Sequence, residues 1–321
     1  MGEVKWQTRV TSLLGIKYPI IQGGLAYLAY ADLAAAVSNA GGLGQITAMS
    51  LPDEKRLREE IQKVRSLTDK PFGVNLAIGQ HGRAYEHMLN VVLEERVPVL
   101  SVTGGNPKDI LNKAKGENIK TLVLVAAKRQ AIKAEELGAD VVMVVGQEGG
   151  GHLGRGDIGT MVLTPYVREH VSIPVVASGG IVDGKGMMAA LALGAEGIEM
   201  GTRFIATTEC VDAHMAYKQA ILHADEESTV VIKRSLGKPA RALRNPWTEQ
   251  ILEAEERGQG YEALKGLISG QANRRYAIDG EEKSGFGWAG QGAARIEKIL
   301  SAEEVIQSTI REAEEIRNKW R

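Results

Sequence analysis

The sequence predicts an α/β protein built as a (β/α)8 TIM barrel, with a helical lid inserted near its C-terminal end. Eight short apolar segments, each of strand length, alternate with helix-length segments along residues 18–220. The repeat is about 25 to 30 residues long, as strand–helix–strand units require. Most of these segments end in glycine or small polar residues, which is typical of turns that lead from a strand into a helix.

The eight apolar segments are expected to be parallel strands. Gly41 and Gly42 end the helix after the first strand, and Glu54 and Arg58 form an i,i+4 charge pair in the helix after the second. The segments are apolar throughout, so each strand is buried on both faces, as in a parallel sheet covered by helices. The predicted strands are residues 18–22, 43–47, 72–75, 97–102, 121–126, 140–145, 173–177 and 197–200.

A doubly wound open sheet is the alternative arrangement. Such a sheet rarely needs eight units of near-equal length, and no segment has the apolar–polar alternation of an exposed edge strand. The barrel is therefore favoured. Active sites of such barrels lie at the carboxyl ends of the strands, which limits the candidate residues to the loops that follow them.

The pattern changes after the eighth strand. A helix is expected over residues 210–220, and residues 225–292, called the lid segment below, show no further apolar strand and are expected to be helix and loop. Ser301 and Glu304 then form a capping box at the start of a terminal helix with one apolar face. The predicted domains are the barrel in residues 1–224, a helical lid or substrate segment in 225–292, and helices packing back on the barrel in 293–321.

Composition indicates a chain that acts on small molecules. With 321 residues and 44% hydrophobic content, the chain can bury a large core. A formal net charge of −1 argues against a nucleic-acid or membrane partner. No apolar run approaches the roughly 18 residues of a membrane span, and the first residues lack the apolar run of a signal peptide. Together with the single cysteine, Cys210, these features predict a cytoplasmic protein.

His152 is the candidate acid or base. It follows Gln147 and a glycine run ending at Gly151, in the loop after the sixth strand, where the backbone can approach a ligand closely. Imidazole titrates near neutral pH, so this position suits proton transfer. A solvated loop histidine is the competing interpretation, which the position at a strand's carboxyl end disfavours. The other histidines fall away from strand ends and are expected to be structural or exposed: His81, His87, His170, His214 and His223.

Two glycine turns predict a phosphate site. The seventh strand ends in residues 178–180 (SGG), and the eighth in Gly201 and Thr202. Backbone N–H groups of turns without Cβ atoms can close around an anion, and the loops after strands 7 and 8 form the usual phosphate site of such barrels. Tight turns also take glycine for backbone reasons alone. Two adjacent turns, followed by Thr202 and Arg203 as donors, favour the phosphate interpretation.

Two further features are interpreted as structural. Residues 285–290 (GFGWAG) match the pattern of a dinucleotide-binding turn, but no clear strand precedes them and no acidic residue follows in a second strand. We interpret them as a glycine-rich lid loop. Cys210, flanked by apolar residues, is expected to be packed. No pair of histidines has metal-site spacing with a carboxylate or thiol, so no metal is expected.

Six motifs occur in order along nearly the whole chain: PIIQGGLA (residues 19–26), AGGLGQI (40–46), DKPFGVN (69–75), EGGGHLG (148–154), SGGIVDGKG (178–186) and EMGTRF (199–204). In these motifs the chain resembles the nitronate monooxygenase superfamily, formerly called 2-nitropropane dioxygenases. That superfamily also includes FMN-dependent enoyl-acyl-carrier-protein reductase II and NADH:quinone reductases. The motifs are specific for the superfamily and much less so for one activity within it.

The resemblance implies that the barrel binds FMN and that His152 is the catalytic histidine. Leu25 stands where the family often has methionine beside the flavin, so flavin potential or substrate fit can differ. The fifth strand brings no lysine to the ring, unlike in some relatives. The predicted cofactor-binding residues are Gly23, Gly24, Leu25 and Asn75 at the flavin ring, Ser178, Gly179, Gly180, Gly201 and Thr202 at the phosphate, and Gln147, Gly151 and Met200 at the same strand ends.

The leading functional hypothesis is FMN-dependent oxidation of alkyl nitronates by O2 to a carbonyl compound and nitrite. The alternative is an NAD(P)H-dependent FMN reductase acting on a quinone or on enoyl-acyl-carrier-protein, because residues 235–247, 268–271 and 287–290 also resemble quinone reductases. A non-catalytic FMN or phosphate binder is disfavoured by His152, and a flavin-free lyase by the lack of a Schiff-base lysine at a strand end. A homodimer is a hypothesis. The physiological substrate, the electron partner and the choice between NADH and NADPH stay open.

Overall fold

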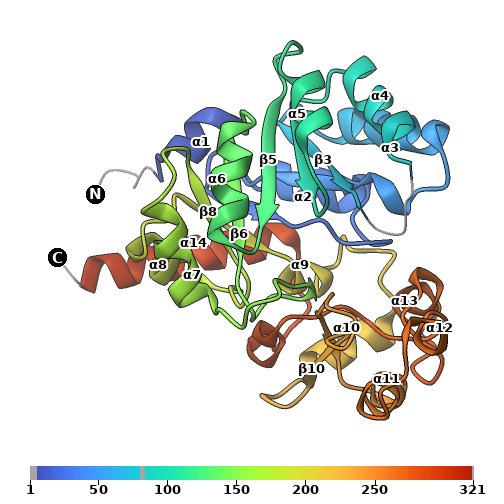
Figure 1. Ribbon diagram of the computed structural model, residues 1–321. Helices are drawn as coiled ribbons and strands as arrows, with labels where there is room; N and C mark the ends of the chain where they lie inside the picture. The colour runs from blue at the N-terminus through green and yellow to red at the C-terminus, as the bar shows by residue number, and fades with distance from the viewer. Residues whose placement is uncertain (1–5, 80–83, 320–321) are drawn as a thin grey trace.

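The protein is a parallel barrel with a smaller covering unit, as seen in a computed structural model that describes residues 6–79 and 84–319. Eight parallel strands pair in the order β1-β9-β8-β6-β5-β4-β3-β2. Figure 1 shows these strands with helices around them. The strands are β1 (Ile20–Gln22), β2 (Gly44–Thr47), β3 (Phe72–Ala77), β4 (Val99–Thr103), β5 (Lys120–Val125), β6 (Val141–Val145), β8 (Val175–Ser178) and β9 (Gly197–Met200).

The sheet closes on itself through β1. On one side, β1 pairs in parallel with β9, with Ile20 opposite Ile198. On the other side, Ile21 forms a parallel bridge with Leu43, just before β2, and the Gln22 N–H donates to the Leu43 carbonyl over 2.9 Å. The (β/α)8 prediction is therefore confirmed, and the open-sheet alternative is wrong.

Helices cover the outside of the barrel because each has one apolar stripe. In α3 (Glu54–Leu67), Leu57, Ile61 and Val64 recur at helical spacing and are fully buried, and the Asp53 carboxylate caps the first turn. The other outer helices that follow strands are α2 (Ala31–Asn39), α4 (Glu86–Glu94), α5 (Lys108–Ala114), α6 (Lys128–Glu136), α7 (Thr160–Arg168) and α8 (Gly184–Ala192), and a short 3-10 turn, η1 (Ala48–Ser50), follows β2.

The helix after β9 has a single turn, α9 (Thr202–Ile205), so the ring of outer helices is completed from elsewhere. The C-terminal helix, α14 (Ala302–Lys319), packs between α8 and α2. Its first turn has the predicted capping box, in which Ser301 and Glu304 exchange hydrogen bonds. Ile306 and Ile310 are buried in the same hydrophobic cluster as residues of β1 and β9.

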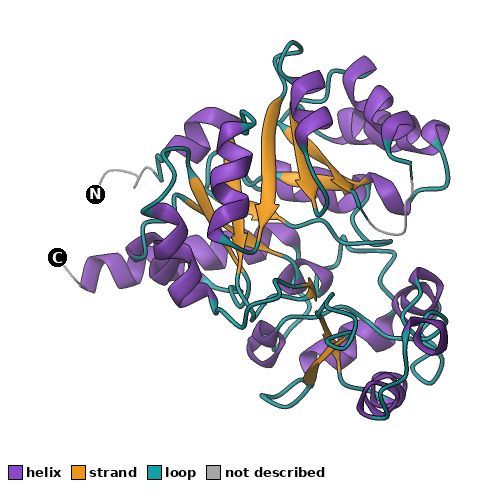
Figure 2. Ribbon diagram, in the orientation of Figure 1, coloured by secondary structure: helices purple, strands orange, loops and turns teal. Residues whose placement is uncertain are grey.

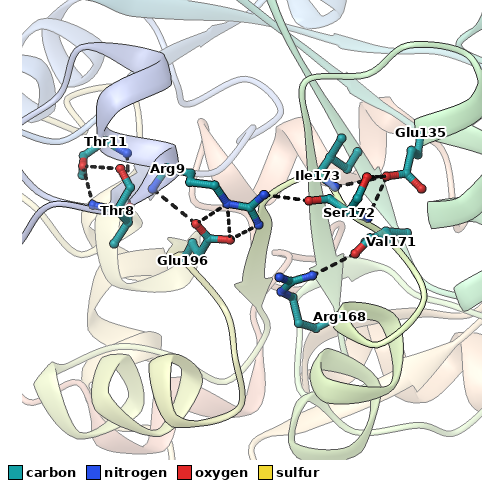
Figure 3. Close-up of polar contacts among 9 residues, drawn as sticks. All are labelled: Thr8, Arg9, Thr11, Glu135, Arg168, Val171, Ser172, Ile173 and Glu196. Atoms are coloured by element: carbon teal, nitrogen blue, oxygen red, sulfur yellow. Dashed lines mark hydrogen bonds and ion pairs between the residues drawn. The ribbon is translucent and has the colours of Figure 1, made fainter.

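The first helix, α1 (Arg9–Leu14), covers the amino-terminal end of the barrel. Val10 and Leu14 belong to a buried cluster with side chains from the strands. Arg9 fixes the helix from outside: its guanidinium forms an ion pair with Glu196, before β9, and donates to the Ser172 carbonyl over 2.7 Å (Figure 3). α1 therefore closes this end of the barrel, and the cavity described below lies at the opposite end.

The lid segment lies on the side to which β5 points, together with α10 (Met215–Leu222) (Figure 2). It contains β-structure that the sequence analysis missed. A three-stranded antiparallel sheet has the order β10-β11-β7. Two of these strands, β10 (Thr229–Ile232) and β11 (Ala240–Leu243), belong to the lid segment, and β7 (Gly151–His152) comes from the loop after β6. The expectation that residues 225–292 form only helix and loop is therefore wrong. The helices α11 (Pro246–Glu256), α12 (Tyr261–Leu264) and α13 (Gly270–Ala277) pack beside this sheet, and a 3-10 turn, η2 (Gln291–Arg295), leads back to the barrel.

Within residues 6–79 and 84–319, no helix combines the length and apolar composition needed to cross a bilayer. The same residues bring together no group of three or more His, Cys, Asp or Glu side chains that could hold a metal ion.

Candidate active site

A cavity of about 580 Å3 lies at the carboxyl ends of the barrel strands, between the barrel and the lid segment. The loops after β1, β2, β6, β8 and β9 line the cavity on the barrel side, together with Asn75 of β3. Lys233, Asn273 and Trp288 line it from the lid segment. Of the residues singled out from the sequence, those lining the cavity are Gly23, Gly24, Leu25, Asn75, Gly151, His152, Ser178, Gly179, Gly180, Gly201 and Thr202.

The floor of the cavity is backbone, because two glycines follow β1. A Cβ atom on Gly24 would lie 2.6 Å from Asn75 Oδ1, and one on Gly23 would lie 3.3 Å from Glu199 Oε1. Asn75 cannot easily turn away, since its Nδ2 donates to Ser101 Oγ and Thr103 Oγ1 over 2.9 and 3.0 Å. A flat ring can therefore lie on the Gly23–Gly24 backbone with an amide oxygen and a carboxyl group beside it.

The two glycine turns predicted to hold phosphate lie side by side at the cavity. Gly179 and Gly180 have φ of +95° and +76°, a region that residues with a Cβ rarely adopt. Thr160 Oγ1 contacts the Ser178 and Gly179 carbonyl oxygens at 3.1 and 2.9 Å and so fixes this turn. Thr202, after the second turn, lines the cavity and accepts a hydrogen bond from Gly290 N–H over 3.0 Å.

Arg203 does not join these turns, contrary to its expected role as a phosphate donor. Its Nη2 donates to the carbonyl oxygens of Ala206 and Lys298 over 2.6 and 2.7 Å, and the side chain does not line the cavity. Burial lowers the pKa of the guanidinium to about 10, so it remains charged at neutral pH. Arg203 is the second residue of α9, and its side chain lies on the side of this helix away from the cavity. There it binds the Lys298 carbonyl, in the segment that leads to α14.

Two other predicted cofactor contacts lie outside the cavity lining. Gln147 Nε2 donates to the carbonyl oxygens of Gly154 and Gly156 over 3.0 and 2.7 Å, and so shapes the loop that carries His152. Met200 is fully buried and packs in the cluster that includes Phe204. Both residues are therefore positioned to support the cavity wall.

His152 projects from a strand rather than from a free loop. β7 pairs with β11, with His152 opposite Ala240, so the lid segment holds the imidazole in place. The ring centroids of His152 and Trp288 are 5.6 Å apart. The Nε2 atom lies 2.9 Å from Lys233 Nζ. Of the other histidines, His170 is exposed and bonds to the Tyr166 carbonyl, and His81 lies outside the described residues.

The glycine-rich loop with Trp288 closes over the His152 loop. A Cβ atom on Gly150 would lie 2.6 Å from Gly290 N, so the two loops can cross only as backbone. Trp288 also forms an antiparallel bridge with Ala242 in β11. Residues 285–290 are thus a lid loop, as predicted, and they line the ligand cavity through Trp288 and Gly290.

Two ionisable residues of the cavity were missed in the sequence. Glu199, in β9, is 7% exposed, and burial raises the pKa of its carboxyl group above the ordinary value. Lys233, directly after β10, is 6% exposed, and burial lowers the pKa of its ammonium group to about 8. A lone acidic residue inside an otherwise apolar strand was the available signal for Glu199.

Cys210 plays no part in this site. The thiol is fully buried, and burial raises its pKa to about 12, so it stays protonated. This agrees with the prediction that it is packed rather than nucleophilic.

A sealed parallel barrel with a glycine-floored cavity, two anion-suited turns and a histidine above them defines a ligand-binding enzyme of the (β/α)8 class. Comparison with known proteins narrows the class. The family model described as nitronate monooxygenase matches residues 7–86 and 77–312. A probable nitronate monooxygenase of Staphylococcus saprophyticus is 34% identical over 98% of this chain and 100% of its own length. The corresponding protein of Staphylococcus haemolyticus is 36% identical over 89% of this chain and 91% of its own.

Solved structures agree in fold. FabK from Thermotoga maritima superposes with a TM-score of 0.91 at 40% identity, covering 98% of both chains. Nitroalkane oxidase from Streptomyces ansochromogenes superposes with a TM-score of 0.84 at 28% identity, covering 98% of this chain and 100% of its own. The chain belongs to the nitronate monooxygenase family. It is an enzyme of the oxidoreductase class.

Proposed function

We propose that this protein binds FMN in the cavity and oxidises alkyl nitronates with O2, giving a carbonyl compound and nitrite. The observation that carries the proposal is the opposition of two surfaces across one cavity in a chain of this family: a backbone floor at Gly23 and Gly24, and His152 held above it by the lid segment. The floor suits a flat ring, and the imidazole suits a small polar substrate lying on that ring.

The residues present fit FMN. The ring would lie over Gly23, Gly24 and Leu25, with Asn75 Oδ1 at its edge, because Gly24 has no Cβ and its backbone therefore lies directly against Asn75 Oδ1. The turns at 178–180 and 201–202 would hold the phosphate through backbone N–H groups and the Thr202 hydroxyl. Bound FMN supplies the redox chemistry. Gln147, Gly151 and Met200 would complete the site, Gln147 and Met200 by supporting its wall.

His152 is proposed as the catalytic residue that faces the substrate. An imidazole at this position can take a proton from the carbon of a neutral nitroalkane, or it can stabilise the negative charge of a nitronate. The Trp288 ring lies beside it, 5.6 Å between centroids, and limits its motion, while the imidazole keeps an exposed face. Either role needs His152 within hydrogen-bond reach of the substrate, which a substrate between imidazole and floor would satisfy.

The alternative function, NAD(P)H-dependent reduction of a quinone or an enoyl thioester, is the second candidate. The resemblance of residues 235–247 to quinone reductases favours it. Two cations of this stretch, Arg241 and Arg244, are already engaged within the chain. Arg241 donates to the Gln147 carbonyl and Thr229 Oγ1, and Arg244 pairs with Glu249. Nucleotide phosphates would have to displace these contacts, which is why nitronate oxidation is preferred.

Three further assignments belong to the same proposal. The barrel spans residues 1–224, the lid segment faces the substrate, and residues 293–321 return to the barrel. A cytoplasmic location fits a buried thiol at Cys210.

A homodimer is proposed, and light scattering of the purified protein would test it.

The function is tested by product analysis. The FMN-loaded protein is mixed in air-saturated buffer with ethyl nitronate, and nitrite and acetaldehyde are measured against oxygen consumed. We expect both products to form without any nicotinamide. Rapid oxidation of NADH or NADPH in the presence of a quinone or enoyl thioester, with no nitrite from the nitronate, would transfer the assignment to the reductase alternative.

A further inference from the structure

Lys233 forms a buried cationic group directly beside the histidine of the site. Its Nζ atom lies 2.9 Å from His152 Nε2 and 5.1 Å from the centre of the Trp288 ring. The side chain is 6% exposed and lines the cavity. A lysine in this position is unusual, because an ammonium group is seldom buried without a carboxylate partner.

Local backbone contacts position this lysine. Its backbone has φ of +64°, in the left-handed region that costs energy for residues with a Cβ. That conformation is held by Glu255 of α11, whose Oε2 accepts from the Lys233 N–H over 2.7 Å. The same carboxylate accepts from the Ser235 N–H over 2.8 Å. Glu255 thus fastens the turn after β10 so that the lysine side chain enters the cavity.

The contact with Lys233 determines where His152 carries its proton. An ammonium group has three donors and no acceptor, so Nε2 of His152 must be the acceptor. The imidazole is then neutral, with its proton on Nδ1. Burial lowers the Lys233 pKa to about 8, which leaves the group mostly charged at neutral pH. A second proton on Nε2 would face this ammonium group, so His152 is a poor base while Lys233 is charged.

We propose that Lys233 binds the negative charge of the substrate and holds His152 as a neutral hydrogen-bonding group, so that the site accepts preformed anions with a planar head group. This inference rests on the proposed function and deepens it. One of the three N–H donors of Lys233 is directed to His152, which leaves two N–H donors that can bind substrate oxygens. A neutral nitroalkane, which must lose a carbon-bound proton, is a poor substrate for such a pair.

The first test measures binding and does not depend on turnover. Nitrate, a planar anion, is titrated into the FMN-loaded wild-type protein and into Lys233→Met and Lys233→Arg variants, and the visible absorbance of the flavin is followed. Lys265→Met is the matched control, because Lys265 is an exposed lid-segment lysine outside the cavity. We expect Lys233→Met to weaken nitrate binding at least about tenfold, Lys233→Arg to retain most of it, and the control to match wild type. Equal nitrate binding by wild type and Lys233→Met, or none by wild type, would overturn the proposal.

The second test separates substrate binding from chemistry. For ethyl nitronate, Lys233→Met should raise KM at least about tenfold and change kcat less, and wild type should use ethyl nitronate far better than nitroethane at neutral pH. Wild-type turnover of nitroethane as fast as that of the nitronate would contradict the inference. If wild type oxidises no nitronate at all, the proposed function fails, and the nitrate titration still decides the role of Lys233. Circular dichroism and thermal unfolding of each variant show whether it is folded.

Discussion

The amide oxygen of Asn75 lies where a side chain on Gly24 would begin, 2.6 Å from the position of a Cβ atom. Asn75 belongs to β3 and Gly24 to the turn after β1, so the sequence around either residue does not reveal that the two are in contact. Ser101 and Thr103 hold the asparagine from the next strand. Because of this contact, the cavity floor has no room for a side chain at position 24.

Gly24→Ala should reduce FMN affinity at least about tenfold, because the methyl group must displace either the fixed Asn75 amide or the ring. Fluorescence titration of the apoprotein with FMN measures the change. Gly116→Ala is the control, since Gly116 is exposed and no heavy atom lies within 4 Å of its added Cβ. Unchanged FMN affinity in Gly24→Ala would show that the cofactor does not use this floor.

His152→Gln should lower kcat/KM for ethyl nitronate by about 10²-fold or more while FMN stays bound, because the substrate loses its imidazole partner but the floor and turns are untouched. Steady-state kinetics and the flavin-to-protein absorbance ratio measure the two effects. His170→Gln, at an exposed position just after α7, should behave as wild type. Full activity in His152→Gln would remove the histidine from the mechanism.

Glu199 should make stability depend on pH. Burial raises the pKa of its carboxyl group above the ordinary 4.5, so the folded chain keeps a proton that the unfolded chain releases. The unfolded state then binds fewer protons, and the free energy of unfolding falls as pH rises above that value. Glu199→Gln removes this contribution. Urea unfolding of the two apoproteins should therefore show the variant gaining stability relative to wild type between pH 5 and pH 8. A constant difference would mean that Glu199 ionises freely in the folded chain.

Ile306→Ala should cost about 2 to 5 kcal/mol of unfolding free energy, because this fully buried side chain fastens α14 to the barrel. Arg311→Ala, at an exposed position on the same helix, should change the free energy by less than about 0.5 kcal/mol. Denaturant unfolding checks both values. A loss in Ile306→Ala no larger than in the control would mean that the terminal helix is not part of the barrel's cooperative unit.

The barrel could be predicted from the sequence because its strands carry a strong local signal. Segments such as Val141–Val145 are continuously apolar, and glycine turns separate them from helices at a regular interval. The three-stranded sheet carried a local signal only in the four residues of β10, Thr229–Ile232, which read TVVI. β7 has two residues, one of them Gly151, and β11 (Ala240–Leu243) reads ARAL, which lacks β-branched residues. β11 pairs with β10, which is near it in sequence, and with β7, about 90 residues earlier in the chain.

The cavity was predictable where the backbone itself makes the site. The turns at 178–180 and after β9 were expected to meet because carboxyl ends of neighbouring parallel strands share one edge, and they do. Side-chain direction could not be read in the same way. Arg203 was expected at the cavity but turns to the Lys298 carbonyl, and Lys233 enters the cavity only because Glu255 holds its backbone. Both outcomes depend on contacts distant in sequence.

Electron transfer from a nitronate to bound FMN, on which the proposed function depends, can be followed in one anaerobic experiment. The FMN-loaded protein is mixed without oxygen with ethyl nitronate, and separately with NADH and NADPH, while the visible absorbance of the flavin is recorded. We expect fast bleaching by the nitronate, none of comparable rate by either nucleotide, and recovery of the absorbance when air is admitted. Fast bleaching by a nicotinamide with no response to the nitronate would contradict it.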